Sequence, residues 1–255
     1  MYEITMLNQD EINSLHFEAD SFVRKDLEDN YSFYRDIFQW KEAGHQLGDR
    51  IDQKLTEHLM MKFPGKIGFE RRAGKKCNRS MGDFWFKNSN GCYIPINTKV
   101  GVVNDGHILG QPNIASINKV MDGIINGILD SYYLLIIKLF VDTHTKRLHH
   151  KVWFTDILDW LDKSVVTFDA GPGQMMLKAK KFHELLNETD TSASPRLDVK
   201  TKLHFLKNLF DDGEKRLLLN REKNRKAMDK KYNLFMSRGT GEGSFVGSCS
   251  LMEIS

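Results

Sequence analysis

The amino-acid sequence predicts an α/β fold, with a central mixed β-sheet flanked by helices and a mainly helical C-terminal part. Residues 81–99 contain two strand-like runs joined by Asn90-Gly91, a strong sequence signal for a β-hairpin. Apolar residues then recur at helical spacing from Ser116 to Leu129. A mostly apolar run at 132–141 follows and predicts a buried strand. A hairpin, a helix and a further strand in this order are typical of a sheet covered by helices.

Three helices are expected before the hairpin. The first runs from Gln9 to about Leu27, with Asp10 as its N-cap, and the second spans 31–40. Gly44 and Gly48 then interrupt the helical pattern. The third helix follows these glycines and ends at 63–65, where the sequence reads Phe-Pro-Gly.

Beyond the central run, 149–154 predicts another strand, and 203–210 and 216–236 predict two helices. The polar stretch 189–195 marks a candidate boundary. We therefore expect a core at 1–190 that includes the N-terminal helices. Residues 191–255 form a helical and loop extension that we expect to serve recognition or dimerisation.

Composition limits the classes of protein that the chain can represent. Three cysteines without a CxxC pair argue against a disulfide framework and against a cysteine-rich zinc site, and they favour the reducing cytoplasm. No signal peptide is expected, because the N-terminal residues include acids and lack an apolar run. The longest apolar run is too short to cross a bilayer, so no membrane partner is expected. A net charge of +3 does not by itself indicate nucleic-acid binding.

Three residues of the hairpin carry the chemistry. Side chains alternate along a strand, so Asn97 and Lys99 share one face, and the hairpin can bring Asp83 beside them. A carboxylate and an amide oxygen suit a hard cation such as Mg²⁺. Such an ion can polarise a scissile phosphate and activate a water, while the ammonium of Lys99 offsets the charge of the transition state. This patch therefore predicts phosphodiester hydrolysis.

The sequence resembles the PD-(D/E)XK nuclease superfamily over roughly residues 44–154. Asp83 matches the first Asp of the family pattern and Lys99 matches the final Lys. The middle position is Asn97 where the family has Asp or Glu, and Gly82 replaces the family's Pro. The amide removes one negative charge, which changes the affinity for the metal or the number of ions held.

The resemblance also implies a metal-binding acid from a preceding helix. Gly48 and Ile51 match the family's spacing of a glycine and an apolar residue before that acid, which is Asp52 here. A solvated helix face is the alternative for this residue. The resemblance implies a restriction-endonuclease-like fold, a catalytic set of Asp83, Asn97, Lys99 and Asp52, and Mg²⁺ held by Asp83, Asn97 and Asp52.

A basic loop directly before the metal strand is expected to contact DNA. Phosphate neutralisation is its functional interpretation, and an ordinary basic surface is the alternative. Two polar residues after the hairpin are further candidates for contact. The expected DNA-binding residues are Arg71, Arg72, Lys75, Lys76, Arg79, Gln111 and Asn113.

The function that these features favour is a Type II restriction endonuclease acting on double-stranded DNA. The resemblance implies a homodimer, because a two-fold protein matches a palindromic site, and a cognate DNA methyltransferase as genetic partner. Two alternatives stay open. One is a structure-specific repair or recombination nuclease of the same fold, and the other is a DNA-binding protein with a degenerate site, which the amide at Asn97 favours.

Overall fold

The computed structural model describes residues 6–37, 43–68, 82–104, 107–108, 113–142, 147–178, 180–182, 184 and 196–238. The chain divides into two units, residues 1–213 and residues 214–255. The first unit contains both sheets and the candidate site. The second contains the later part of the C-terminal helix.

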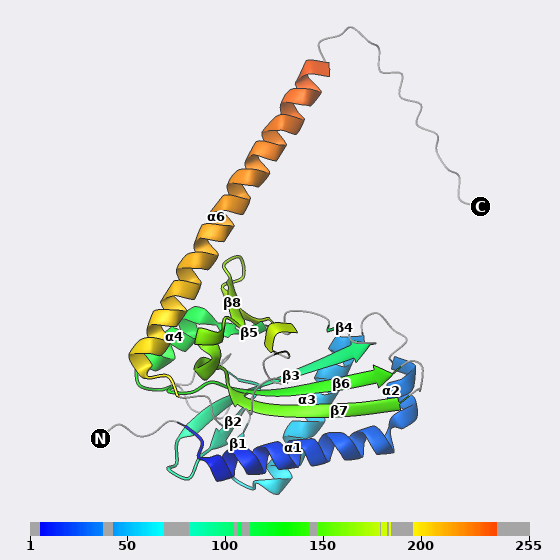
Figure 1. Ribbon diagram of the computed structural model, residues 1–255. Helices are drawn as coiled ribbons and strands as arrows, with labels where there is room; N and C mark the ends of the chain where they lie inside the picture. Colours follow the sequence, from blue (N-terminus) through cyan, green and yellow to red (C-terminus); the bar gives the residue numbers. More distant parts are fainter. Residues whose placement is uncertain are drawn as a thin grey trace, which may run out of the picture. The chain divides into compact units, whose positions relative to one another are not determined.

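A large mixed sheet of six strands organises the first unit (Figure 1). Its strand order is β1-β2-β3-β6-β7, and the short strand β4 also pairs with β3. Pairing is antiparallel from β1 to β3, parallel between β3 and β6, and antiparallel between β6 and β7. The strands are β1 (Ile67–Gly68), β2 (Phe84–Lys87), β3 (Tyr93–Asn104), β4 (His107–Ile108), β6 (Tyr133–Asp142) and β7 (Arg147–Asp156).

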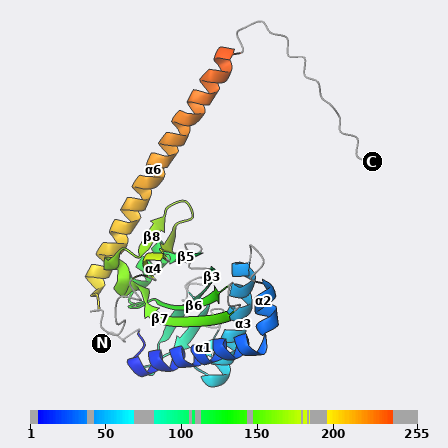
Figure 2. The same ribbon diagram turned by 45° about the vertical axis from the view of Figure 1, so that its right-hand side comes forward.

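Alternation along these strands produces two apolar cores, one on each side of the large sheet. Ile94 and Ile96 of β3 belong to the core that helices α1 and α3 cover, and we name this side the α1/α3 face. Leu134 and Ile136 of β6 belong to the other core, together with helix α4, and we name this side the α4 face. Figure 2 shows the two layers on opposite sides of the strands. The expected mixed sheet flanked by helices is confirmed.

Helices α1 (Gln9–Asp29), α2 (Tyr31–Ile37) and α3 (Ala43–Lys62) precede the sheet. The N-cap of α1 is Asn8 and not Asp10 as expected from the sequence. Asn8 and Glu11 form a reciprocal capping box, which satisfies two backbone N–H groups where Asp10 alone would satisfy one. Helix α3 also runs through Gly44 and Gly48, which were expected to interrupt it. Packing of its apolar side against the sheet outweighs the intrinsic cost of helical glycine.

The α4 face is covered by elements that the sequence patterns only partly revealed. Helix α4 (Ile117–Ile125) ends before Leu129, because Gly127 adopts a positive φ of 66° and the chain folds back on Gly123. A second sheet of order β5-β9-β8 lies beside it, and this sheet was missed in the sequence. The remaining elements are β5 (Asn113–Ser116), the 3-10 helix η2 (Ile157–Lys163), β8 (Val166–Asp169) and β9 (Gln174–Leu177).

A single helix, α6 (Val199–Arg238), replaces the two helices expected at 203–210 and 216–236. Gly213, which lies between the two expected helices, is buried against Phe168, where a Cβ atom would come within 2.3 Å of Cδ1 of that ring. The glycine therefore permits close packing of a continuous helix. None of the helices that the structure describes is long and apolar enough to span a bilayer.

Candidate active site

The β2–β3 hairpin places Asp83 beside β3. Phe84 pairs with Ile96, and the backbone N–H of Asp83 donates to the carbonyl of Ile96 at 2.9 Å. A Cβ atom at Gly82 would lie 2.9 Å from the backbone N and O of Ile96. The close approach of the two strands thus requires a glycine at the position where the family pattern has proline.

The carboxylate of Asp83 is held by the backbone of β3. Its Oδ2 accepts a hydrogen bond of 2.6 Å from the N–H of Thr98. Although the residue is exposed overall, removal of water around the carboxyl raises its pKa, and the Lys99 ammonium and the Thr98 N–H oppose this by favouring the ionised form. The structure therefore brings Asp83 and Lys99 close enough for their charges to interact.

Asn97 lies on the α4 face and is buried. Its Nδ2 donates to the carbonyl of Ile114 at 2.7 Å and to the hydroxyl of Tyr132 at 3.2 Å. An aspartate here would lack these donors and would face a carbonyl oxygen, which gives a structural reason for the amide. The Oδ1 of Asn97 is enclosed and has no hydrogen-bond partner in the described part of the chain.

An unsatisfied, enclosed acceptor is uncommon in a folded protein and indicates a missing partner. The partner of Asn97 Oδ1 could be a cation or a cation-bound water. Asp83 directly precedes β2 and Asn97 lies on the neighbouring strand β3 of the hairpin, and their carboxylate and amide oxygens are ligands of the kind that would suit Mg²⁺. Among the described residues, no group of three or more His, Cys, Asp or Glu side chains could hold a metal ion.

The structure places Asp52 on the helix layer that covers the side of the sheet away from Asn97. It lies on α3, whose apolar residues Ile51, Leu55 and Leu59 pack into the core of the α1/α3 face. Asn97 instead lies on the α4 face. The metal-binding role expected for Asp52 therefore stays a prediction, without support from the geometry.

Most of the expected DNA-contact residues lie outside the described residues. This applies to Arg71, Arg72, Lys75, Lys76, Arg79 and Gln111. Asn113 is described, and it is exposed at the start of β5. Its neighbour Ile114 supplies the carbonyl that orients Asn97. Asn113 is therefore close along the chain to a residue that contacts the candidate site.

Sequence reasoning missed Lys138 of β6. This lysine is 7% exposed, and its register partner Gly101 lies two residues beyond Lys99 on the same face of β3. Two signals in the sequence could have identified it. One is a lone lysine inside an apolar run, and the other is a glycine in phase with Asn97 and Lys99.

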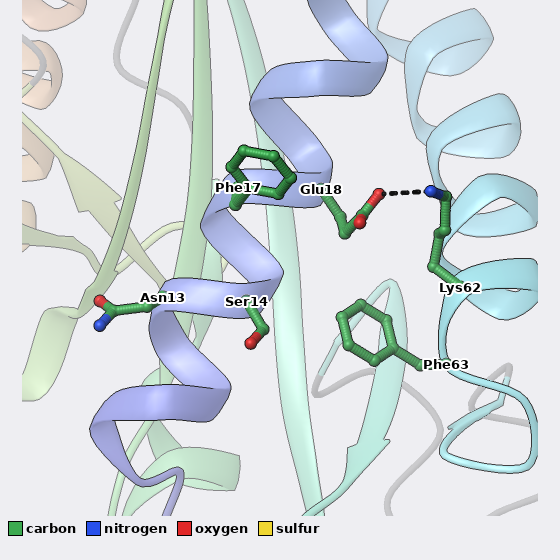
Figure 3. Close-up of a pocket in the computed structure, with 6 residues that line it drawn as sticks. All are labelled: Asn13, Ser14, Phe17, Glu18, Lys62 and Phe63. Carbon is green, nitrogen blue, oxygen red and sulfur yellow. Dashed lines mark ion pairs between the residues drawn. The ribbon is translucent and has the colours of Figure 1, made fainter.

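A surface pocket of about 350 Å³ lies on the opposite side of the sheet (Figure 3). It is formed by α1 and the end of α3, and Figure 3 shows the ion pair of 3.3 Å between Glu18 and Lys62 beside Phe63. Its lining residues are Asn13, Ser14, Phe17, Glu18, Lys62 and Phe63. The pocket does not include the hairpin residues, so it is separate from the candidate active site.

Comparison of the chain with protein-family models gives no match. Comparison with curated proteins also gives no match. The hairpin geometry and the sequence motif within it are therefore the features of this chain that indicate a function.

Proposed function

We propose that this chain is a magnesium-dependent endonuclease that hydrolyses double-stranded DNA, and that it is a Type II restriction enzyme resembling the PD-(D/E)XK superfamily. One observation carries the proposal. The carboxylate of Asp83 accepts a hydrogen bond of 2.6 Å from the backbone N–H of Thr98. Thr98 lies between Asn97, whose side chain has an amide oxygen, and Lys99, whose side chain has an ammonium. The hairpin thus supports a site with the first acid and the lysine of the motif, in which the amide of Asn97 takes the place of the second acid.

Each group has a specific role in the proposed reaction. Asp83 and Asn97 would hold the cation through oxygen atoms. Bound Mg²⁺ supplies Lewis-acid polarisation of the scissile phosphate and lowers the pKa of a bound water. Lys99 orients the attacking water and offsets the negative charge that develops on the phosphoryl oxygens. The water oxygen bonds to phosphorus as the bond to the 3′ oxygen breaks, which leaves a 5′-phosphate.

The order of elements supports the same proposal. Helix α3 precedes the β2–β3 hairpin, and helix α4 then leads to β6, which pairs parallel to β3. The resemblance implies this order of helix, hairpin, helix and strand. We also propose a homodimer, because a two-fold enzyme matches a palindromic site, and a DNA methyltransferase as genetic partner.

Digestion of plasmid DNA with Mg²⁺ tests the proposal. Wild type should give discrete, reproducible fragments. Lys99→Ala should slow cleavage by about 10²–10³-fold, which is typical when one group that stabilises the transition state is removed. Binding to the same DNA should change little. The control is Lys25→Ala, which removes an exposed lysine of α1 and should cleave like wild type.

The alternatives predict different results in the same assay. Nicking that depends on junctions or mismatches would identify a structure-specific nuclease. Retention of full activity by Lys99→Ala would remove this lysine from the mechanism and overturn the proposed site.

A second candidate function is DNA binding without cleavage. The observation in its favour is that Asn97 replaces an acid and that the described residues lack a cluster of three potential metal ligands. Gel-shift binding by wild type, with no cleavage at any concentration of Mg²⁺ or Mn²⁺, would select this function.

A further inference from the structure

Lys138 is a buried lysine in an unusual setting. Its side chain lies on the α4 face of β6, and burial lowers the pKa of its ammonium. No hydrogen bond or ion pair joins it to any residue that the structure describes. Burying an ammonium without a partner is costly, so a lysine at this position requires another explanation than fold stability.

The backbone of β3 makes room for this ammonium. Gly101 pairs with Lys138 across the parallel β3–β6 ladder. A Cβ atom at Gly101 would lie 2.4 Å from Nζ of Lys138 and 3.2 Å from Cδ and Cε. The lysine therefore lies across the glycine and occupies the space that a side chain at position 101 would take.

A second lysine lies on the same face of the sheet, on the strand next to β6. Lys151 of β7 is directly opposite Lys138 in the antiparallel β6–β7 ladder, so both side chains project from the same face. Lys151 is exposed and also has no ion pair within the described residues. The Lys138 side chain extends over Gly101 on β3, away from β7, so the two ammonium groups lie at separate places on this face.

These two lysines lie next to the candidate active site. Lys99 precedes Gly101 by two residues on β3, which corresponds to about 7 Å along the strand. Lys99, Lys138 and Lys151 thus place three ammonium groups on one face of three adjacent strands. Separated cations in a row fit a ligand with several anionic groups better than a single small anion.

We propose that Lys138, seated over Gly101, forms with Lys151 a site that binds backbone phosphate of DNA beside the Asp83–Lys99 centre. The placement of this site beside a reacting phosphate rests on the proposed nuclease function, whereas the binding of phosphate does not. Lysine donates hydrogen bonds but accepts none, and phosphate oxygens only accept, so the two groups are complementary in charge and in hydrogen bonding. Contacts of this kind position the duplex without reading its sequence.

The test measures binding of a fluorescent duplex by anisotropy, without divalent metal, over a range of salt concentrations. The variant Lys138→Met removes the ammonium and retains an unbranched apolar side chain. It should weaken binding by a similar factor for any duplex sequence and reduce the slope of log affinity against log salt by about 1. The matched control is Lys25→Met on the α1/α3 side, which should leave the slope unchanged.

Gly101→Ala provides a second variant in which the lysine is kept. The added methyl group displaces a flexible Nζ atom, so we expect little loss of stability and a loss of binding similar to that of Lys138→Met. A slope for Lys138→Met equal to that of Lys25→Met would overturn the inference, even if wild type cleaves plasmid. A reduced slope in a chain that never cleaves would support the phosphate site and reject the nuclease. Absence of duplex binding by wild type would reject both.

Discussion

Two buried lysines on the same side of the large sheet differ in the polar partners that surround their ammonium groups. Lys202 of α6 is 3% exposed and donates to the carbonyl of Asp130, and its Nζ also lies 3.1 Å from Asp159 and 3.7 Å from Asp156. Lys138 is 7% exposed and has no such partner among the described residues. A buried lysine with partners joins parts of a fold, whereas one without partners is available for a ligand. The comparison therefore separates a structural region from a candidate binding region.

The largest expected effect tests the structural region. Lys202→Met leaves the carboxylates of Asp156 and Asp159 without their buried cation, and removing one partner of a buried ion pair costs about 3–5 kcal/mol. Urea denaturation measures the free energy of unfolding. The control Lys207→Met removes an exposed partner of Asp211, and a loss of at most about 1 kcal/mol is expected there. Equal losses in the two variants would show that Lys202 does not join α6 to the core.

Two glycines give the next contrast. Gly213→Ala forces a methyl group against the Phe168 ring and to 3.0 Å from its carbonyl oxygen, and such overpacking costs about 1–3 kcal/mol. In Gly101→Ala the added methyl group contacts only the outer atoms of the flexible Lys138 side chain. The loss in the free energy of unfolding should therefore be smaller than for Gly213→Ala. A smaller decrease of the melting temperature for Gly101→Ala than for Gly213→Ala would show that the region around Lys138 accommodates an added methyl group better than the region around Phe168.

A smaller effect concerns the pH dependence at Asp83. Its pKa is raised in the folded chain, so the folded state keeps the proton to higher pH than the unfolded chain does. The group stabilises the fold below its unfolded pKa, and this contribution is lost as the pH rises through the raised value. Asp83→Asn does not titrate, so its free energy of unfolding should increase relative to wild type as the pH rises above the ordinary carboxyl pKa of about 4. A constant difference across this range would indicate that the pKa is not raised.

The smallest expected change is in the stability of Lys138→Met. The substitution removes an ammonium that gains nothing from its described surroundings, so the free energy of unfolding should stay the same or increase. A loss comparable to that of Lys202→Met would mean that Lys138 supports the fold, and the distinction between the two lysines would then be wrong.

The sequence was most informative where contacts are local. The Asn90-Gly91 turn and the alternation of Ile94, Ile96 and Asn97 predicted the hairpin and the face on which Asn97 lies. The second sheet could not be predicted because β5 and β9 are far apart in sequence and each strand is short. Two helices were expected where α6 is continuous for the same reason, since the packing of Gly213 depends on the distant ring of Phe168.

In the candidate site, too, contacts between residues close in sequence could be predicted and contacts between distant residues could not. The contact between Asp83 and β3 follows from a hairpin and could be anticipated. The orientation of Asn97 depends on Ile114 and Tyr132, and the position of Lys138 depends on a parallel pairing, so neither could be derived from local pattern.

Parallel pairing of β3 with β6 has a consequence for the folding of the chain. The hairpin that holds Asp83 closes over few residues and can form early, whereas β6 reaches β3 only after a long intervening segment has been ordered. The ammonium of Lys138 is therefore expected to reach Gly101 in a late and slow kinetic phase. An intermediate that traps the hairpin alone would already hold the acid and Lys99 and would still lack the second lysine.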